Sequence, residues 1–324
     1  MRRVVIAQNS TEIERLSGLW ERLCAGSQSA TMFQSFALNR LVAQMLRRDQ
    51  PFVVAAETES GAAIIPAAIS NGALTLLGDC LFDYRDILSD GDPEALALAW
   101  QTLAEKNLSL YVPGIRNEGH QEIWEALGST RWCAAPCLPC SAMLAEDVCA
   151  AHSRLGSRLR KLKRNGAELK QYTGSDSRLV RWIYERKAQQ PTGAWPNVFT
   201  DSARIDFMVA WCAMAGPQCE IFCFEAGSEI VSALVTFLDC SPAAARRFYT
   251  VYFDPRWEKF SPGTVLVYEI VRRTLAEGLD ADFMTGEQPH KLRLATTSVP
   301  LYSVSADAAA MRMISESLIA QVAA

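Results

Sequence analysis

The sequence has no apolar run long enough to cross a membrane. Hydrophobic residues make up 49% of the 324 residues and charged residues 21%, and the longest apolar stretches stay below the roughly 18 residues that a membrane helix needs. The N-terminus has two arginines followed by a short apolar stretch at residues 4–7, which is less than a signal peptide requires. We therefore expect a cytoplasmic protein, free or held at the inner face of the membrane.

The sequence is also poor in histidine and lacks common catalytic motifs. Its three histidines are isolated and no His-Glu-x-x-His pair occurs, so we expect no metal. The Walker loop, Gly-x-Gly-x-x-Gly and Gly-x-Ser-x-Gly are missing as well. The formal net charge is −4, from 32 basic and 36 acidic residues, which gives no reason to expect nucleic acid as a partner.

Ten cysteines without a secretion signal are expected to be reduced and mostly buried. Cys133, Cys137 and Cys140 have a spacing that radical enzymes use to hold an iron–sulfur cluster. Two interspersed prolines and the lack of a following barrel pattern argue against a cluster. We interpret the segment as a Pro-rich crossover into a strand at residues 140–144.

The length fits two domains, and the predicted elements repeat. In the first half, apolar spacing and turn residues predict helices and strands over residues 11–25 (helix, capped by Thr11), 33–46 (helix), 52–57, 62–69 and 74–77 (strands), 92–106 (helix, capped by Asp92), 109–112 (strand) and 118–127 (helix). In the second half they predict helices over 178–189, 200–215 and 261–277, and strands over 218–225, 230–238, 246–253 and 280–284. Both halves read helix, helix, hairpin, strand, helix, strand. We predict an α/β fold with mixed sheets, made of two copies of one domain over residues 1–148 and 149–324, with a linker at 145–152.

A basic segment precedes the second set of elements. Residues 154–164 contain six lysines and arginines and no acid. Leu155, Leu159 and Leu162 form one apolar stripe, so a helix is expected with the cations around it. The cations either meet a lipid-linked diphosphate or an anionic bilayer, or simply form a solvated face.

The clearest chemical signal is the start of the helix at residues 261–277. A strand ends before Asp254, and Ser261 then precedes Pro262, which suits the first helical position. A helix N-terminus offers free backbone N–H groups and a partial positive charge. The sequence predicts either a phosphate cradle at residues 263–265, assisted by Arg256 and Lys259, or an ordinary capped helix that binds nothing.

Several short motifs resemble one known family, the GNAT-type acyltransferases of the cellulose-biosynthesis (CelD-like) type. The resemblance spans residues 50–302 and includes the basic segment at 158–164. Its motifs are Asp83-Tyr84-Arg85-Asp86, Asp254-Pro255, Ser261-Pro262-Gly263, Asp282-Phe283 and Gly286-Glu287 followed by His290-Lys291. The family has tyrosine where this chain has His290, which puts a role for that phenol in doubt.

The resemblance implies two tandem GNAT-like domains, the first on the acceptor side and the second binding acyl-coenzyme A. It implies transfer of an acyl group, acetyl or longer, to an amine of a small molecule, a glycan or a lipid-linked acceptor, with contact to membrane or polysaccharide-synthesis machinery. The donor would contact Tyr249, Arg256, Lys259, Ser261, Pro262, Gly263, Thr264 and Val265. The catalytic candidates are Glu287, His290, Lys291 and Tyr252. The acceptor would contact Asp83, Tyr84, Asp86 and Asp282; alternatively, residues 83–86 are simply a polar loop.

In this scheme the thioester lies along the strand at residues 249–253, whose N–H groups polarise its carbonyl. Glu287 or His290 removes the proton of the amine, and Tyr249 or Tyr252 protonates the leaving thiolate. Two alternatives stay open. One is an aminoacyl-tRNA-dependent transferase related to the peptidyltransferases of cell-wall synthesis, and the other is a non-catalytic partner in polysaccharide biosynthesis.

Overall fold

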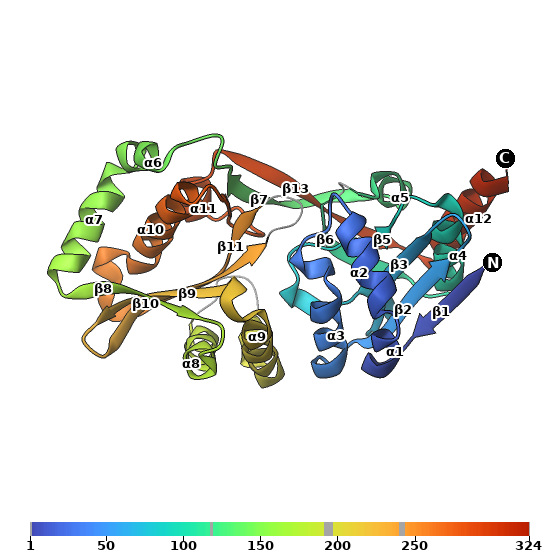
Figure 1. Ribbon diagram of the computed structural model, residues 1–324, viewed down its shortest axis with the longest axis horizontal. Helices are drawn as coiled ribbons and strands as arrows, with labels where there is room; N and C mark the ends of the chain where they lie inside the picture. The colour runs from blue at the N-terminus through green and yellow to red at the C-terminus, as the bar shows by residue number, and fades with distance from the viewer. Residues whose placement is uncertain (1, 117–118, 191–196, 240–243, 324) are drawn as a thin grey trace. The chain divides into compact units, whose positions relative to one another are not determined.

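The computed structural model describes residues 2–116, 119–190, 197–239 and 244–323 (Figure 1). The chain divides into two compact units. Unit 1 consists of Met1–Cys133 and Pro300–Ala324, and unit 2 of Ala134–Val299. Each unit combines a mixed sheet with several helices, so the expected α/β class with mixed sheets is confirmed.

In unit 1 the strand order is β1-β2-β3-β4-β6-β13, with β5 paired to β3. Strands β1 to β4 are antiparallel neighbours, whereas β4 and β6 are parallel and meet at Leu74 and Leu110. The strands are β1 (Arg3–Ala7), β2 (Gln50–Glu57), β3 (Ala62–Ser70), β4 (Ala73–Leu76), β5 (Leu88–Ser89), β6 (Leu110–Ile115) and β13 (Thr297–Ala306).

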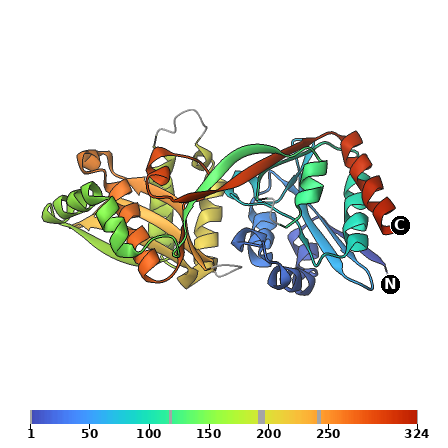
Figure 2. The ribbon, with the colours of Figure 1, turned by 90° about the horizontal axis from the view of Figure 1, so that it is seen from above.

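The helices of unit 1 enclose a core that includes the fully buried Trp100 and Trp124. Helix α12 packs against α4, as Figure 2 shows for the red C-terminal helix. Asp92 caps α4 as predicted, with its carboxylate accepting the N–H groups of Glu94 and Ala95. The helices are α1 (Ser10–Glu14), α2 (Ser17–Gly26), η1 (Met32–Gln34), α3 (Phe36–Met45), η2 (Asp79–Leu81), α4 (Pro93–Ala104), α5 (Gln121–Ala126) and α12 (Ala308–Ala323).

In unit 2 the strand order is β7-β12-β11-β10-β9-β8. The neighbours are antiparallel except β11 and β12, which are parallel. The strands are β7 (Thr130–Leu138), β8 (Ala167–Thr173), β9 (Cys219–Ala226), β10 (Glu229–Asp239), β11 (Ala245–Phe253) and β12 (Asp280–Asp282).

Helices cover both faces of the sheet of unit 2. Figure 1 shows α8 and α9 on one face and α10, with α6 and α7 packed on it, on the other. None of the described helices of the chain combines the length and apolar character of a membrane span. The helices are α6 (Ala145–Ala151), α7 (Ser153–Arg164), α8 (Ser177–Ala188), η3 (Val198–Thr200), α9 (Ser202–Ala215), η4 (Gly216–Gln218), η5 (Pro255–Phe260), α10 (Pro262–Ala276) and α11 (Pro289–Leu292).

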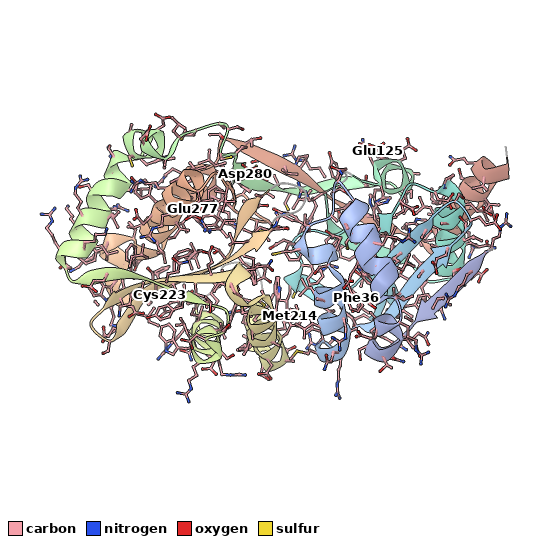
Figure 3. The ribbon with its side chains drawn as sticks, viewed as in Figure 1. Phe36, Glu125, Met214, Cys223, Glu277 and Asp280 are labelled. Carbon is pink, nitrogen blue, oxygen red and sulfur yellow. The ribbon has the colours of Figure 1, made fainter. Side chains whose placement is uncertain are left out.

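A buried arginine, paired through all three of its guanidinium nitrogens, fixes β11 against its neighbours. The side chain of Arg246 is 1% exposed and donates to Glu220 Oε2, Thr274 Oγ1 and Glu277 Oε2, each at 2.8 Å. Glu277, labelled in Figure 3, directly follows α10. A buried charge needs such complete pairing because its desolvation is costly. Arg246 therefore ties β11 to β9 and to the end of α10.

The division into units differs from the expected boundary after residue 148. Strand β13 pairs with β6 from Tyr302 opposite Ile115 onward, and α12 packs on α4, so the C-terminal segment completes unit 1. The expected linker at residues 145–152 contains helix α6, which packs on α10. The pairing of the C-terminal segment with unit 1 was not predicted, because the sequence of a strand or a helix does not show which other elements it packs against.

Three local predictions were wrong. The single helix expected over residues 11–25 is two helices, α1 and α2. The N-cap of α1 is Asn9, whose side chain accepts the Glu12 N–H, and not Thr11. The cysteine segment is strand β7, which contains Cys133 and Cys137, whereas no strand covers residues 140–144. No group of three or more metal-binding side chains occurs among the residues that the structure describes.

Candidate functional site

Strand β11 parts from β12 after three residue pairs. The parallel pairing runs only from Ala245 opposite Asp280 to Arg247 opposite Asp282, whereas β11 continues to Phe253 against β10 on its other side. In the described part of the chain, no strand pairs with the β12 side of β11 at residues 248–253. This stretch of β11 therefore has an open edge.

The register shows which backbone groups face the open edge. Asp254 donates its N–H to the Val231 carbonyl on the β10 side at 2.9 Å. Because successive residues of a strand point their backbone groups to opposite sides, Val251 and Phe253 turn their N–H and C=O groups to the open edge. Two N–H groups on one strand edge can polarise a carbonyl that lies along it.

Two side chains from the end of α8 reach the same edge. Lys187 Nζ donates to the Val251 carbonyl at 3.0 Å, and Gln190 Nε2 donates to the Phe253 carbonyl at 2.9 Å. Burial lowers the pKa of Lys187. Neither residue was predicted from the sequence, because helix periodicity shows on which face of a helix a side chain lies but not which strand it reaches.

Helix α10 begins close to this edge, and its first turn is as predicted in part. Pro262 occupies the first helical position, and Ser261 is the N-cap residue. The Ser261 side chain makes no capping hydrogen bond; its Oγ accepts from Arg158 Nη1 of α7 at 2.6 Å. Ser261 has φ 51° and ψ 53°, a left-handed conformation. The basic helix thus places a cation at the start of α10.

The predicted cradle of backbone N–H groups is smaller than expected. Val265 donates its N–H to the Ser261 carbonyl inside the helix at 3.0 Å, so it is not available to a ligand. Among the described residues, the N–H groups of Gly263 and Thr264 have no such partner. A Cβ on Gly263 would lie 3.2 Å from Val251 Cγ1. The glycine therefore lets the helix start pack directly on the open strand.

The cation beside Ser261 belongs to a larger basic cavity. A cavity of about 530 Å³ is lined by His152, Arg154, Arg158 and Arg293, together with small and apolar residues but no carboxylate. Burial, followed by the charge of Arg293, lowers the pKa of His152. A cavity lined by cations without carboxylates suits an anionic ligand.

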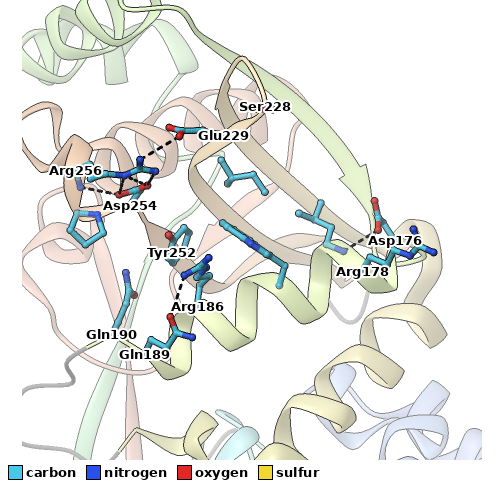
Figure 4. A pocket seen from close by; sticks show the side chains of 14 residues that line it. Asp176, Arg178, Arg186, Gln189, Gln190, Ser228, Glu229, Tyr252, Asp254 and Arg256 are labelled. Atoms are coloured by element: carbon cyan, nitrogen blue, oxygen red, sulfur yellow. Dashed lines mark hydrogen bonds and ion pairs between the residues drawn. The ribbon is translucent and has the colours of Figure 1, made fainter.

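Arg256 and Lys259, expected to assist a phosphate, are engaged otherwise. Arg256 pairs with Asp254 Oδ2 at 2.6 Å and Glu229 Oε1 at 3.3 Å, as Figure 4 shows. The hydrogen bonds from Arg256 hold the pKa of Asp254 below its usual range. Lys259 lies over the ring of Phe260 at 5.0 Å. Two carboxylates thus share the charge of Arg256, and its role towards a phosphate stays a prediction.

A larger cavity lies on the α8 side of β11. Its volume is about 880 Å³, and Trp182, Arg186, Tyr252 and Asp254 are among its lining residues (Figure 4). Tyr252 is 6% exposed and packs edge-on against Trp182 with ring centres 5.3 Å apart. Burial, and then the charge of Asp254, raises the pKa of Tyr252. Its phenol therefore carries a proton at neutral pH.

Tyr249 lies in an aromatic cluster. Its ring meets Trp211 edge-on at 5.1 Å and Phe237 at 5.6 Å. These contacts join β11 to β10 and to helix α9, so they account for a large aromatic side chain at this position. The structure thus separates the two tyrosines: Tyr252 lines a cavity, and Tyr249 packs the α9 face of the sheet.

His290 lies in α11 among cations. Burial lowers its pKa, and the charges of Lys291, Lys187 and Arg293 lower it further. Lys187 is the residue that binds the Val251 carbonyl at the open edge. The arrangement keeps the His290 imidazole neutral at neutral pH, which is the form that accepts a proton.

The other two catalytic candidates in this region differ from His290. Lys291 Nζ donates to the Thr285 carbonyl at 2.7 Å and the Met284 carbonyl at 3.4 Å, so it braces the loop before α11. Glu287 is an exposed residue of that loop. Of the three, His290 has the burial and the neutral charge state that a general base uses.

Asp282, expected to contact the acceptor, belongs to an ion-pair network. Its carboxylate pairs with Arg247, which is 4% exposed and also binds Asp239 Oδ2 at 2.7 Å. Asp282 Oδ1 accepts the Met284 N–H at 2.8 Å. These bonds hold β11, β12 and the following loop together, so they explain an aspartate at position 282 without any contact to a ligand.

The acceptor candidates of unit 1 are largely buried. Tyr84 is 2% exposed and packs under the guanidinium of Arg116 at 5.1 Å. Asp86 is 6% exposed and binds His120 Nδ1 at 3.1 Å and Trp124 Nε1 at 3.0 Å. Asp83 is half-buried. The structure brings Asp86 into a polar cluster that the sequence did not predict.

Comparisons with known proteins agree with this architecture. Residues 151–292 match the family model described as an acetyltransferase (GNAT) domain. A search of the curated proteins found no match. Three solved structures are similar over nearly the whole chain, at sequence identities that establish the fold alone.

The first is the C-terminal domain of a putative lysylphosphatidylglycerol synthetase from Agrobacterium fabrum, with 8% identity, TM-score 0.59, and 96% of this chain and 98% of that chain covered. The second is FemX, with 9% identity, TM-score 0.59, and 91% and 98% covered. The third is a tandem GNAT protein from the clavulanic acid biosynthesis pathway, with 12% identity, TM-score 0.51, and 94% and 98% covered. The GNAT acetyltransferase domain matched at residues 151–292 indicates an acyltransferase, and the chain shares its fold with a tandem GNAT protein.

Proposed function

We propose that the chain is an N-acyltransferase that moves an acyl group, acetyl in the simplest case, from coenzyme A to an amine. The acceptor would be an amino sugar or another precursor of a polysaccharide or of the cell envelope, as the resemblance to the CelD-like type implies. The observation that carries the proposal is the open edge of β11 beside the start of α10. GNAT domains use acyl-coenzyme A, and a thioester with a diphosphate tail needs both features.

The donor would bind in two places. Its diphosphate would accept from the N–H groups of Gly263 and Thr264, with Arg158 supplying charge. The basic cavity beside Arg158 offers further cations to the phosphates. Its thioester would lie along the open edge, where the Val251 and Phe253 N–H groups polarise the carbonyl.

The proposed reaction needs one base and one acid. The amine nitrogen attacks the thioester carbon, the carbon–sulfur bond breaks, and the amine proton passes to His290, which is neutral because burial and nearby cations lower its pKa. The thiolate leaves and takes a proton from Tyr252, whose raised pKa keeps the phenol protonated. We propose Lys187 as a further site residue, since its Nζ holds the strand edge that carries the thioester.

Substitution of Arg158 tests the donor site. Arg158→Ala removes the guanidinium that binds Ser261 Oγ, and we expect acetyl-coenzyme A affinity to fall about fivefold to tenfold, the scale of one partly exposed charge-assisted hydrogen bond. Lys161→Ala is the matched control, because it removes one charge from the exposed face of the same helix. The measurement is the shift in melting temperature with acetyl-coenzyme A, which stabilises by about 2.7 kcal/mol at 100 times its dissociation constant.

Equal losses in the two variants would mean that α7 acts only through its overall charge. If neither acetyl- nor longer acyl-coenzyme A shifts the melting temperature of the unaltered protein, the proposal is contradicted. Gly263 is a poorer test site than Arg158, because a side chain there would also press on Val251.

A second candidate is an aminoacyl-tRNA-dependent transferase. It is favoured by α7, whose six lysines and arginines form no ion pair with a described carboxylate, and by the fold shared with FemX and a putative lysylphosphatidylglycerol synthetase. Binding to tRNA that weakens steeply with salt, together with no response to acyl-coenzyme A, would select this candidate.

A further inference from the structure

A chain of three side chains in unit 1 has the order of a nucleophilic serine site. His120 Nδ1 lies 3.1 Å from Asp86 Oδ1, and His120 Nε2 lies 3.1 Å from Ser89 Oγ. Both distances allow hydrogen bonds. A nucleophile bonded to a base that is itself oriented by a third group is the arrangement that activates a hydroxyl.

The chemistry of the groups fixes the direction of the two bonds. An ionised carboxylate can only accept, so the proton shared with Asp86 belongs to His120 Nδ1. In the neutral imidazole, Nε2 then carries the lone pair and accepts the Ser89 hydroxyl. This tautomer is the one in which a histidine removes a proton from serine.

Further hydrogen bonds fix the carboxylate of Asp86, whereas Ser89 is partly exposed. Asp86 is buried and also accepts the Trp124 Nε1–H at 3.0 Å and the Ile87 N–H at 2.8 Å, so its carboxylate is fixed. The side chain of His120 is 10% exposed. Ser89 ends the two-residue strand β5 and is half-buried, and its Oγ also accepts the Gly91 N–H at 3.3 Å.

We propose that Ser89, His120 and Asp86 form a second reactive site, at which Ser89 is the nucleophile towards small acyl esters. Ser89 Oγ attacks the ester carbonyl carbon as its proton moves to His120 Nε2, and the carbon–oxygen bond to the alcohol breaks as that proton passes to the alcohol. Water then attacks the acyl-serine, giving one proton to His120. The acid leaves, and Ser89 recovers the proton. Asp86 is a positioning residue. The site lies in unit 1 and does not depend on the proposed acyl transfer from coenzyme A.

A fluorophosphonate probe tests the nucleophile directly. The Ser89 oxygen would form a bond to phosphorus and displace fluoride, with the hydroxyl proton taken by His120. We expect one adduct per chain by intact mass, mapped to Ser89 by peptide sequencing, and no adduct in Ser89→Ala. The matched control is Ser29→Ala. The Ser29 hydroxyl lies beside Gly119, next to the cluster, but it is not one of the three residues proposed to react. This variant should be labelled as the unaltered protein is.

Two further variants separate a reactive site from a structural cluster. His120→Gln keeps a polar side chain, and we expect it to slow labelling at least 100-fold. Asp86→Asn should also slow labelling, because the wrong histidine tautomer then faces Ser89. Its melting temperature is measured to show that the variant is folded. Hydrolysis of p-nitrophenyl acetate should follow the same order. Absence of labelling in the folded unaltered protein, or labelling that persists in Ser89→Ala, would overturn the proposal.

Discussion

The two units repeat one order of elements but begin their equivalent central helices differently. In unit 1, α4 starts at Pro93 after Asp92, whose carboxylate accepts two backbone N–H groups of the first turn. In unit 2, α10 starts at Pro262 after Ser261, whose side chain leaves the first turn alone and binds Arg158 instead. One helix start is closed by a negative charge, and the other stays open beside a positive one.

The difference shows how one fold can fill the same helix start with a capping carboxylate or leave it without one. A carboxylate at a helix N-terminus satisfies the free N–H groups and complements the helix dipole. The same carboxylate repels a phosphate. Of these two helix starts, we therefore propose the start of α10 for the diphosphate, whereas Asp92 stabilises the start of α4.

The histidines of the two units differ in the same way. His120 follows β6 and binds the carboxylate of Asp86, whereas His290 follows the equivalent strand β12 and has the cations Lys187 and Lys291 nearby. A carboxylate orients an imidazole, and cations keep it neutral. Three substitutions sharpen this comparison.

The largest effect is expected for His290→Gln. A general base contributes about 10²-fold or more, so we expect kcat/KM of acyl transfer to fall by about that factor. Because burial and neighbouring cations lower the pKa of His290 from 6.5, the ring stays neutral at pH 7, and activity should decline only when the pH falls below 6.5. A pH–rate profile of both proteins measures this. Glu287→Gln should cost less than about threefold, since that residue is exposed; a larger loss there would move the base to Glu287.

A smaller effect is expected for Ser261→Asp, which gives unit 2 the carboxylate of unit 1. We expect affinity for acetyl-coenzyme A to fall about tenfold, or about 1.4 kcal/mol. The free energy of unfolding should be nearly unchanged, because residue 261 has a left-handed backbone, which aspartate tolerates and from which the side chain makes no cap. Isothermal titration and chemical unfolding measure the two quantities. Ser261→Asn is the neutral control and should bind nearly as the unaltered protein does; tight binding by the aspartate variant would contradict a diphosphate at this position.

The smallest effect is expected for Asp92→Ala in unit 1. Loss of the cap should lower the free energy of unfolding by about 1 kcal/mol, while the melting shift with acetyl-coenzyme A is retained. Burial raises the pKa of Asp92, but hydrogen bonds from Thr58, Ala95, Ser60 and Glu94 outweigh it and lower the pKa below 3.8. This contribution to stability is therefore complete above pH 3.8 and is lost as the pH falls further. An equal loss of stability in Asp92→Asn, which keeps the cap, would show that the charge and not the cap is responsible.

Much of the fold was predictable because it depends on the local spacing of apolar residues and on the positions of turn residues. Strand β11, the turn at Pro255 and the start of α10 at Pro262 follow from β-branched and aromatic runs, from proline geometry and from a following amphipathic pattern. The repeated element order also came from such signals. Cap residues were predicted with mixed success, since Asp92 caps α4 whereas Ser261 binds Arg158.

The details of the site were not predictable, because they depend on contacts distant in sequence. Arg158 meets Ser261 across more than a hundred residues, and Lys187 meets Val251 across 64. Arg256 has the residue type for phosphate binding but is held by Asp254, only two positions away. Sequence shows which groups are available, and only packing shows which of them are already used.

The return of the chain into unit 1 sets an order of assembly. Synthesis joins all of Ala134–Val299 to the chain before the segment Pro300–Ala324 that lies on β6 and α4. Unit 1 therefore cannot complete its native contacts until residues 300–324 have been made, whereas every residue of unit 2 precedes that segment.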